Sequence, residues 1–150
     1  MRSLDFPLAV MLLALTATSA TSATPATPSI DPAGRRIVGE WRGTSLCANR
    51  ELAPACKDET VRYIFSGPIG TTNTYHLVAE KLVGTDYQSM GEMDLAYGSA
   101  DSTWKNVFDA RKCKQCAWRF RVRASGLVGA LTTAEGDTLR RVSAVRHEPE

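Results

Sequence analysis

The feature that most constrains the fold of this chain is a strict alternation of large apolar and basic residues between Trp118 and Arg123. Tryptophan, phenylalanine and valine occupy one set of alternate positions, and three arginines occupy the other. A period of two is typical of a β-strand, because successive side chains of a strand point to opposite faces. The segment is therefore predicted to be a half-buried strand with an apolar inner face and a basic outer face.

Similar short stretches, separated by turn signals, run through most of the chain, and we find no long segment with helical period. The other predicted strands cover residues 37–47, 61–65, 74–83, 87–97, 104–108, 127–132 and 139–146. About eight regularly spaced strands without helices favour an antiparallel barrel or sandwich. We predict an all-β fold, a small antiparallel up-and-down β-barrel of about eight strands.

The N-terminal segment has the organisation of a secretory signal peptide. A positive charge at Arg2 precedes the apolar run 8–15 and a region of small hydroxylated residues, which predicts a signal peptide over 1–23. The run is far below the ~20 residues that a spanning helix needs, so no transmembrane segment is expected. Residues 24–35 are rich in threonine, proline and alanine and predict a flexible tail. The barrel domain is expected over 36–147, in a monomer exported to the periplasm or secreted.

The start and the end of the barrel domain carry a further pattern. Gly39-Glu40-Trp41 opens the first strand, and Arg140 and Arg141 lie in the last one. With the meander of strands between them, these residues resemble the calycin superfamily of lipocalin-like barrels. The chain looks like a compact bacterial lipocalin-like protein, or like the small secreted barrel inhibitors of bacterial metalloproteases. The resemblance implies that Arg140 or Arg141 packs across Trp41, a barrel-closing structural pair at the barrel base.

The chain has four cysteines, an even number that favours disulfides in an exported protein. Cys47 and Cys56 bracket a loop between the first two strands, and Cys113 and Cys116 form a Cys-x-x-Cys motif. We favour the local pairing, Cys47–Cys56 with Cys113–Cys116, and a crossed pairing stays open. The alternatives are a redox-active Cys-x-x-Cys, whose thiol pKa its basic neighbours would lower, and a four-thiolate zinc centre.

A search for catalytic residues returns little. His76 lies in mid-strand and His147 in the polar C-terminal tail, and no nucleophile elbow or phosphate-cradling loop is present. Glu92 and Asp94 share one strand face, which a solvated outer surface explains as well as a carboxylate pair does. We therefore expect no enzyme activity, no catalytic residue, no metal and no cofactor.

The densest charge cluster is basic. It consists of Arg119, Arg121 and Arg123 on one strand, with Arg111, Lys112 and Lys114 nearby. The polar outer face of a barrel strand accounts for it. The alternative is an anionic envelope surface, such as phospholipid or lipopolysaccharide headgroups. Nucleic acid is not expected, because the net charge is only +2 and no exposed aromatic ladder accompanies the basic residues.

The apolar face of the predicted strands either fills the barrel or lines a pocket. The large residues expected inside, and hence the hypothetical ligand-binding residues, are Tyr63, Phe65, Tyr75, Met93, Trp118 and Phe120. Our leading hypothesis is a non-catalytic binding protein for a small apolar or amphipathic ligand. The alternatives are a periplasmic protease inhibitor whose N-terminal tail enters the protease, and an envelope domain whose surface binds a macromolecule.

Overall fold

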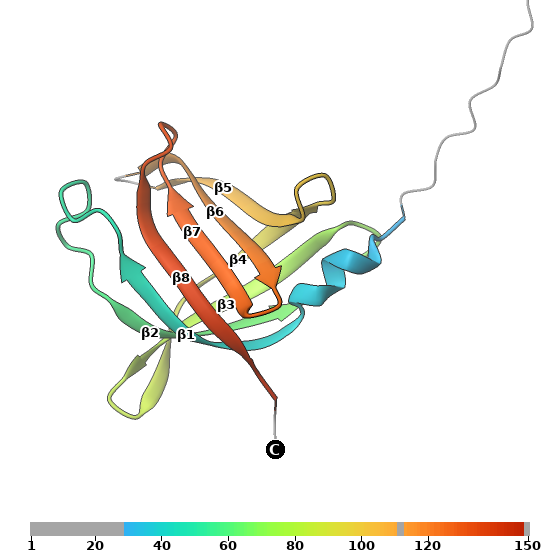
Figure 1. Cartoon of the computed structure of the whole chain (residues 1–150), viewed down its shortest axis with the longest axis horizontal. Helices are drawn as coiled ribbons and strands as arrows, with labels where there is room; N and C mark the ends of the chain where they lie inside the picture. The colour runs from blue at the N-terminus through green and yellow to red at the C-terminus, as the bar shows by residue number, and fades with distance from the viewer. Residues whose placement is uncertain (1–28, 111–112, 149–150) are drawn as a thin grey trace, which may run out of the picture.

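The computed structural model describes residues 29–110 and 113–148. The predicted signal peptide 1–23, the first residues of the predicted tail, and Arg111 and Lys112 lie outside the described residues. The described chain forms a closed antiparallel barrel with a short 3-10 helix at its N-terminal side (Figure 1). The elements are η1 (Pro32–Ile37), β1 (Gly39–Cys47), β2 (Glu59–Ser66), β3 (Thr74–Val83), β4 (Asp86–Gly98), β5 (Thr103–Ala110), β6 (Cys113–Arg123), β7 (Gly126–Thr132) and β8 (Thr138–His147).

The eight strands follow one another around the barrel in chain order. Each strand pairs antiparallel with the next, and β8 returns to pair with β1, where Trp41 lies opposite Arg146. The all-β, up-and-down barrel predicted from the sequence is thus confirmed. None of the helices in the described ranges has the length and apolar character required to cross a membrane.

The strand that defined the alternating pattern is longer than predicted. β6 begins at Cys113 rather than Trp118, because its first residues continue the pairing with β5, where Phe108 lies opposite Cys116. Gln115 adopts a positive φ of 51° in this stretch, and its backbone N–H donates to Asp109 Oδ1 at 2.7 Å. The period-two signal does not extend into this irregular start, so the sequence alone could not locate it.

The prediction of a flexible tail up to residue 35 is wrong for its last residues, which form η1. Asp31 caps this helix by accepting a hydrogen bond from the Ala33 N–H at 2.9 Å, and a proline occupies the first turn. Proline is favoured at this position because the N–H that it lacks would be unpaired there. Gly34 and Ile37 are buried. A Cβ on Gly34 would lie 2.5 Å from the Tyr75 hydroxyl, so only glycine fits without a shift.

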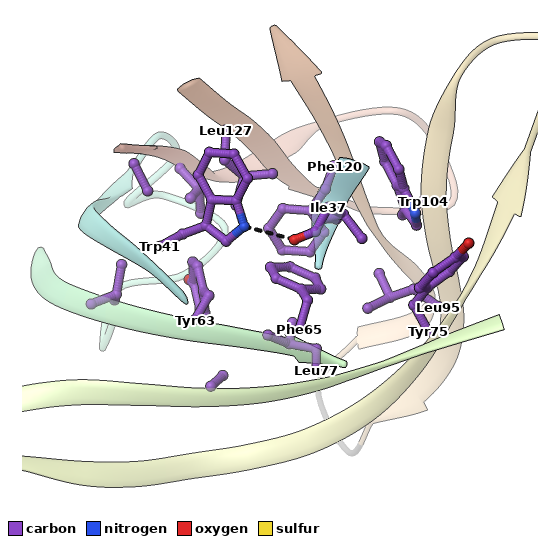
Figure 2. Packing of buried hydrophobic residues seen from close by; sticks show 14 of the residues in the cluster. Ile37, Trp41, Tyr63, Phe65, Tyr75, Leu77, Leu95, Trp104, Phe120 and Leu127 are labelled. Carbon is purple, nitrogen blue, oxygen red and sulfur yellow. Dashed lines mark hydrogen bonds between the residues drawn. The ribbon is translucent and has the colours of Figure 1, made fainter. Parts of the chain in front are cut away.

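Two tryptophans fix η1 across one end of the barrel. The indole N–H of Trp41 donates to the Ile37 carbonyl at 2.7 Å, and that of Trp104 donates to the Gly34 carbonyl at 3.1 Å. Figure 2 shows the first of these bonds, with Ile37 pointing into the cluster of aromatic and aliphatic side chains. Both tryptophans are almost fully buried. We call this closed end, where β1 begins and β8 finishes, the plugged end.

The arginine that covers Trp41 is Arg146, and the assignment to Arg140 or Arg141 is wrong. The Arg146 guanidinium carbon lies 4.3 Å from the centre of a Trp41 ring. Its two terminal nitrogens donate to the Arg36 and Val38 carbonyls, each at 2.6 Å. The register explains this choice, since the start of β1 pairs with the end of β8.

The two arginines named from the sequence lie elsewhere for the same reason. Arg140 is at the start of β8, opposite Cys47 at the far end of the barrel. Arg141, opposite Leu46, is exposed on the outer face. Gly39 completes the arrangement around Arg146, because its φ is +125° and a Cβ there would lie 2.5 Å from an Arg146 nitrogen. The glycine of the Gly-x-Trp pattern thus leaves room for the arginine.

The half of the barrel next to η1 is filled by side chains. Phe120 lies at its centre, with edge-on contacts to Tyr63 and Phe65 at ring distances of 5.8 and 5.6 Å (Figure 2). A Cβ on Gly129 of the neighbouring β7 would lie 2.5 Å from the Phe120 ring, so glycine there makes space for it. Further fully buried residues of this core are Ile37, Val61, Tyr75, Leu77, Leu95 and Leu127.

Candidate functional site

A cavity of about 310 Å³ lies in the half of the barrel away from η1. We call this the cavity end; the connections 48–58, 84–85 and 133–137 lie there. Its walls come from strands on both sides of the barrel. The lining residues are Ser45, Glu59, Tyr63, Leu77, Ala79, Met90, Gly91, Glu92, Met93, Trp118, Phe120 and Arg140. A volume near 300 Å³ is at the lower limit of known small-molecule sites, so the space suits a small ligand.

One wall of the cavity is aromatic and flat. Trp118 and Phe120 occupy successive inward positions of β6, and their rings stack with centroids 5.5 Å apart and an interplanar angle of 12°. Tyr63 contacts the edge of the same phenylalanine. Stacked and edge-on aromatic pairs are favourable, and they hold the rings in fixed positions. The aromatic wall is therefore a preformed apolar surface on which a planar or aliphatic group could lie.

The wall formed by β3 and β4 is more adaptable. Ala79 of β3 presents a small side chain to the cavity, and the register of β3 with β4 shifts after this residue. On β4, Gly91 has a φ of +135°, which suits glycine and few other residues. Met90 and Met93 flank it, and methionine is a flexible residue that adapts its shape to its contacts. The irregular pairing and the small residues leave this side of the barrel unfilled.

A polar cluster forms the third wall. Arg140 Nε donates to the Ser45 hydroxyl at 2.8 Å, and Nη2 donates to the Glu59 carboxylate at 2.9 Å. The side chains of Arg140 and Glu59 are only 16% and 20% exposed. Lys81 Nζ lies 3.6 Å from the other Glu59 oxygen. The cavity thus has apolar walls and one buried polar corner, in which the glutamate pairs with the arginine and, at a longer distance, with the more exposed lysine.

Arg140 also holds the loop above the cavity. Its guanidinium donates to the Ser45 and Lys57 carbonyls at 3.0 and 2.9 Å, and to Cys56 Sγ at 3.3 Å. A disulfide joins Cys56 to Cys47, with Cα atoms 5.9 Å apart. These contacts fix both ends of the connection 48–58 to the barrel. Because the donors of Arg140 are largely committed to the protein, this residue is a poor free site for a second anion.

The phenol of Tyr63 faces the polar corner from β2. Burial raises the pKa of Tyr63 to about 12, while a hydrogen bond with Ser45 and the nearby charge of Arg140 act in the opposite direction. The hydroxyl is therefore neutral at physiological pH and can both donate and accept a hydrogen bond. Neutral polar groups thus reach the cavity from Tyr63 and Ser45.

The structure brings four of the six hypothetical ligand residues to the cavity: Tyr63, Met93, Trp118 and Phe120. The other two, Phe65 and Tyr75, belong to the filled core near η1 and do not line it. Whether the four bind a ligand stays a prediction. Sequence reasoning missed Ser45 and Glu59, and it assigned Arg140 to the opposite end of the barrel. The period-two pattern of residues 37–47 puts Ser45 on the same face as Trp41, and this pattern is the signal from which Ser45 could have been found.

All four cysteines are engaged in the favoured local disulfides. Cys47 pairs with Cys56, and Cys113 pairs with Cys116 in the first part of β6. No cysteine is free, so a four-thiolate zinc centre is not the state of this structure. A redox role for Cys113 and Cys116 is untested.

The histidine and carboxylates noted in the sequence form one cluster on the outer surface. His76 of β3 lies between Asp94 and Glu92 of β4, with Nδ1 2.7 Å from Asp94 Oδ1 and Nε2 3.4 Å from Glu92 Oε2. The hydrogen bond to Asp94 raises the pKa of His76, against a smaller opposing effect of burial. The cluster faces solvent, whereas His147 lies at the end of β8 and is not part of it.

The arginines of β6 face outward, as the alternation predicted. Arg119, Arg121 and Arg123 are exposed, and Arg119 donates to the Thr132 hydroxyl of β7 at 2.8 Å. They line a shallow surface groove with Val128 and two small residues of β7. The described residues of β6, β7 and β8 include no acidic side chain, so this side of the barrel is basic.

Comparisons with protein-family models, with curated proteins and with solved structures found no match to this chain.

Proposed function

We propose that the protein is a non-catalytic, lipocalin-like binding protein of the calycin type that holds a small amphipathic molecule at the cavity end. The observation that carries this proposal is the cavity of about 310 Å³ with an aromatic wall and one polar corner. A barrel of eight strands is just wide enough either to be filled by side chains or to hold one small ligand. Here one half is filled and the other is not.

The chemistry of the walls narrows the ligand class. The apolar part of the ligand would lie against Trp118 and Phe120, which are already stacked. In the polar corner, Glu59 compensates the charge of Arg140, and the arginine's donors are committed to the protein. A second negative charge would compete with Glu59, whereas a hydroxyl or amide could hydrogen-bond to Ser45 or Tyr63. We therefore propose a ligand with a neutral polar group.

The inhibitor alternative receives less support. It needs a free N-terminal segment that can enter a protease cleft. From Asp31 onward the chain is held to the barrel, since the Asp31 N–H donates to the Asn73 side-chain oxygen at 2.8 Å and η1 follows directly. Any inserting segment would have to come from before residue 31. Export to the periplasm or the exterior stays part of the proposal, supported by the sequence of residues 1–23 and by the disulfides.

The test is a pair of fluorescent probes that share a naphthylamine scaffold. N-phenyl-1-naphthylamine is neutral, and 8-anilino-1-naphthalenesulfonate carries an added sulfonate. We expect the neutral probe to bind at least about tenfold more tightly, a difference of 1.4 kcal/mol. Ala79→Phe, which fills the cavity from β3, should weaken binding of the neutral probe by about tenfold or more.

The matched control is Ala130→Phe, which adds the same ring at an outward position of β7. It should bind the probe as the wild type does. Circular dichroism and urea unfolding establish that each variant is folded before binding is compared. Unchanged binding by folded Ala79→Phe would exclude the cavity as the site. Native mass spectrometry of the purified protein then identifies any co-purified ligand.

A further inference from the structure

A second depression, of about 390 Å³, lies on the outside of the plugged end, and nothing in the proposed function uses it. Three arginines from three separate elements line it: Arg36 of η1, Arg123 of β6 and Arg146 of β8. The remaining lining residues are Trp41, Val122, Ala124, Ser125, Gly126 and Val145. No acidic residue is among them. The depression is therefore a concave surface with three positive charges and one hydroxyl.

Arg146 is held in place before any ligand arrives. Its guanidinium lies over Trp41 and donates to the Val38 and Arg36 carbonyls. A guanidinium has five N–H donors, and these two bonds leave others available. Because the indole and the two carbonyls hold the group in place, little side-chain freedom would be lost when it bound an anion.

The charges of this depression are uncompensated in the described part of the chain. Arg42, Arg62 and Arg140 each form an ion pair with a glutamate. Among residues 29–110 and 113–148, no carboxylate forms such a pair with Arg36, Arg123 or Arg146. Three like charges in one concavity repel each other unless an anion binds between them. Here the three arginines come from segments that are far apart in the sequence and are brought together by the fold.

We propose that this depression is a binding site for a phosphate-class oxyanion, either as a soluble phosphate ester or as a lipid headgroup. Guanidinium groups bind phosphate oxygens through paired N–H donors. A phosphate monoester is largely dianionic at neutral pH, and a diester headgroup carries one negative charge. Arg36 and Arg123 close on the anion from two sides, Arg146 supplies the fixed charge, and the Ser125 hydroxyl is a further donor. The site is at the opposite end from the cavity and shares no lining residue with it.

The experiment is isothermal titration of the protein with inorganic phosphate and with pyrophosphate at constant ionic strength. A second arm measures flotation with phosphatidylglycerol vesicles against phosphatidylcholine vesicles. Arg36→Gln and Arg123→Gln are the test variants, because neither side chain forms an ion pair with a carboxylate in residues 29–110 and 113–148. Arg121→Gln is the matched control, since it removes the same charge from the same face of β6, outside the depression.

We expect saturable binding that weakens by about tenfold in each test variant and by less than about twofold in Arg121→Gln. If the protein binds pyrophosphate but does not float with anionic vesicles, the site is assigned to a soluble ester. If it floats with anionic vesicles but does not bind pyrophosphate, the site is assigned to a lipid headgroup. Equal losses in all three variants would show diffuse charge attraction and overturn the site. The absence of binding to phosphate and pyrophosphate up to about 10 mM, and to anionic vesicles, would overturn it as well.

Discussion

The two ends of the barrel use the same strand face in different ways. At the plugged end, Arg146 of β8 lies over Trp41 and secures η1, and the space behind it is full of side chains. At the cavity end, Arg140 points inward from the same strand, but it binds Glu59, Ser45 and the loop carbonyls. Arg146 covers the hydrophobic core, whereas the charge of Arg140 is paired with Glu59 beside an open cavity. The plugged end therefore supplies most of the side-chain packing, and the cavity end supplies the open volume.

The comparison predicts its largest difference between two tryptophans. Trp41→Ala removes an almost fully buried indole, its hydrogen bond to Ile37 and the surface under Arg146. We expect a loss of about 3–5 kcal/mol in the free energy of unfolding. Trp118→Ala at the cavity end removes a partly exposed ring and should cost about half as much or less. Urea unfolding of both variants measures the difference, and equal losses would contradict the division into a filled and an unfilled half.

Replacing the two arginines should give a smaller difference in the free energy of unfolding, and here the larger loss is at the cavity end. Arg140→Met leaves Lys81, which is farther away, as the remaining cation that the described residues place beside the Glu59 carboxylate, whose side chain is 20% exposed. We expect a cost of about 2 kcal/mol, below that of breaking a fully buried pair. Arg146→Met loses an exposed cation–π contact and two hydrogen bonds to carbonyls that solvent can reach, about 1 kcal/mol. The double variant Glu59→Gln with Arg140→Met should recover part of the loss, and thermal unfolding of the set shows whether the order holds.

The smallest expected effect is a pH dependence of stability that arises from His76 on the outer surface of the barrel. His76 faces Asp94 and Glu92 of β4, and its partner on β2 is the uncharged Ser66. Because the hydrogen bond to Asp94 raises the pKa of His76, protonated His76 stabilises the fold fully below its unfolded pKa of about 6.5. This contribution disappears as the pH rises through the higher folded pKa.

Asp94→Asn provides the measurement. The wild type should be more stable than the variant near pH 5.5, by a margin that fades as the pH rises through the raised pKa of His76. Titration of the His76 ring signals by NMR should show a lower pKa in the variant than in the wild type. A margin that does not change with pH would mean that the contact with Asp94 does not depend on the histidine charge.

Much of the fold could be predicted because period-two patterning acts locally. Alternating stretches like the one around Phe120, separated by turn residues, predicted all eight strands and their inward faces. The register between distant strands could not be predicted in the same way. Arg140 and Arg146 have the same parity on β8, so both point inward, and only the pairing of β1 with β8 selects Arg146. An antiparallel closure places the start of the first strand beside the end of the last, and that rule would have given the right arginine.

The remaining misses have different physical causes. η1 is a single short helix whose only local signals are Asp31 followed by proline, too little for a periodic pattern. The cavity depends on the balance of side-chain volumes across the barrel, for example small Ala79 opposite an aromatic wall, and no local pattern encodes that balance. Glu59 lies inside because an arginine from the other end of the chain neutralises it, a contact between residues far apart in sequence.

The closure of β8 onto β1 also has a consequence for synthesis. Arg146 bonds to Val38 and Arg36 across sequence separations of 108 and 110 residues. A nascent chain therefore cannot complete the barrel until its final strand has emerged. Until then β1 and β7 both expose unpaired edges, which can template aggregation. A chain truncated before β8 would thus be an open sheet with two unpaired edge strands. The ten residues of β8 pair with both of these edges, so the chain is protected from edge-to-edge aggregation only after β8 has been added.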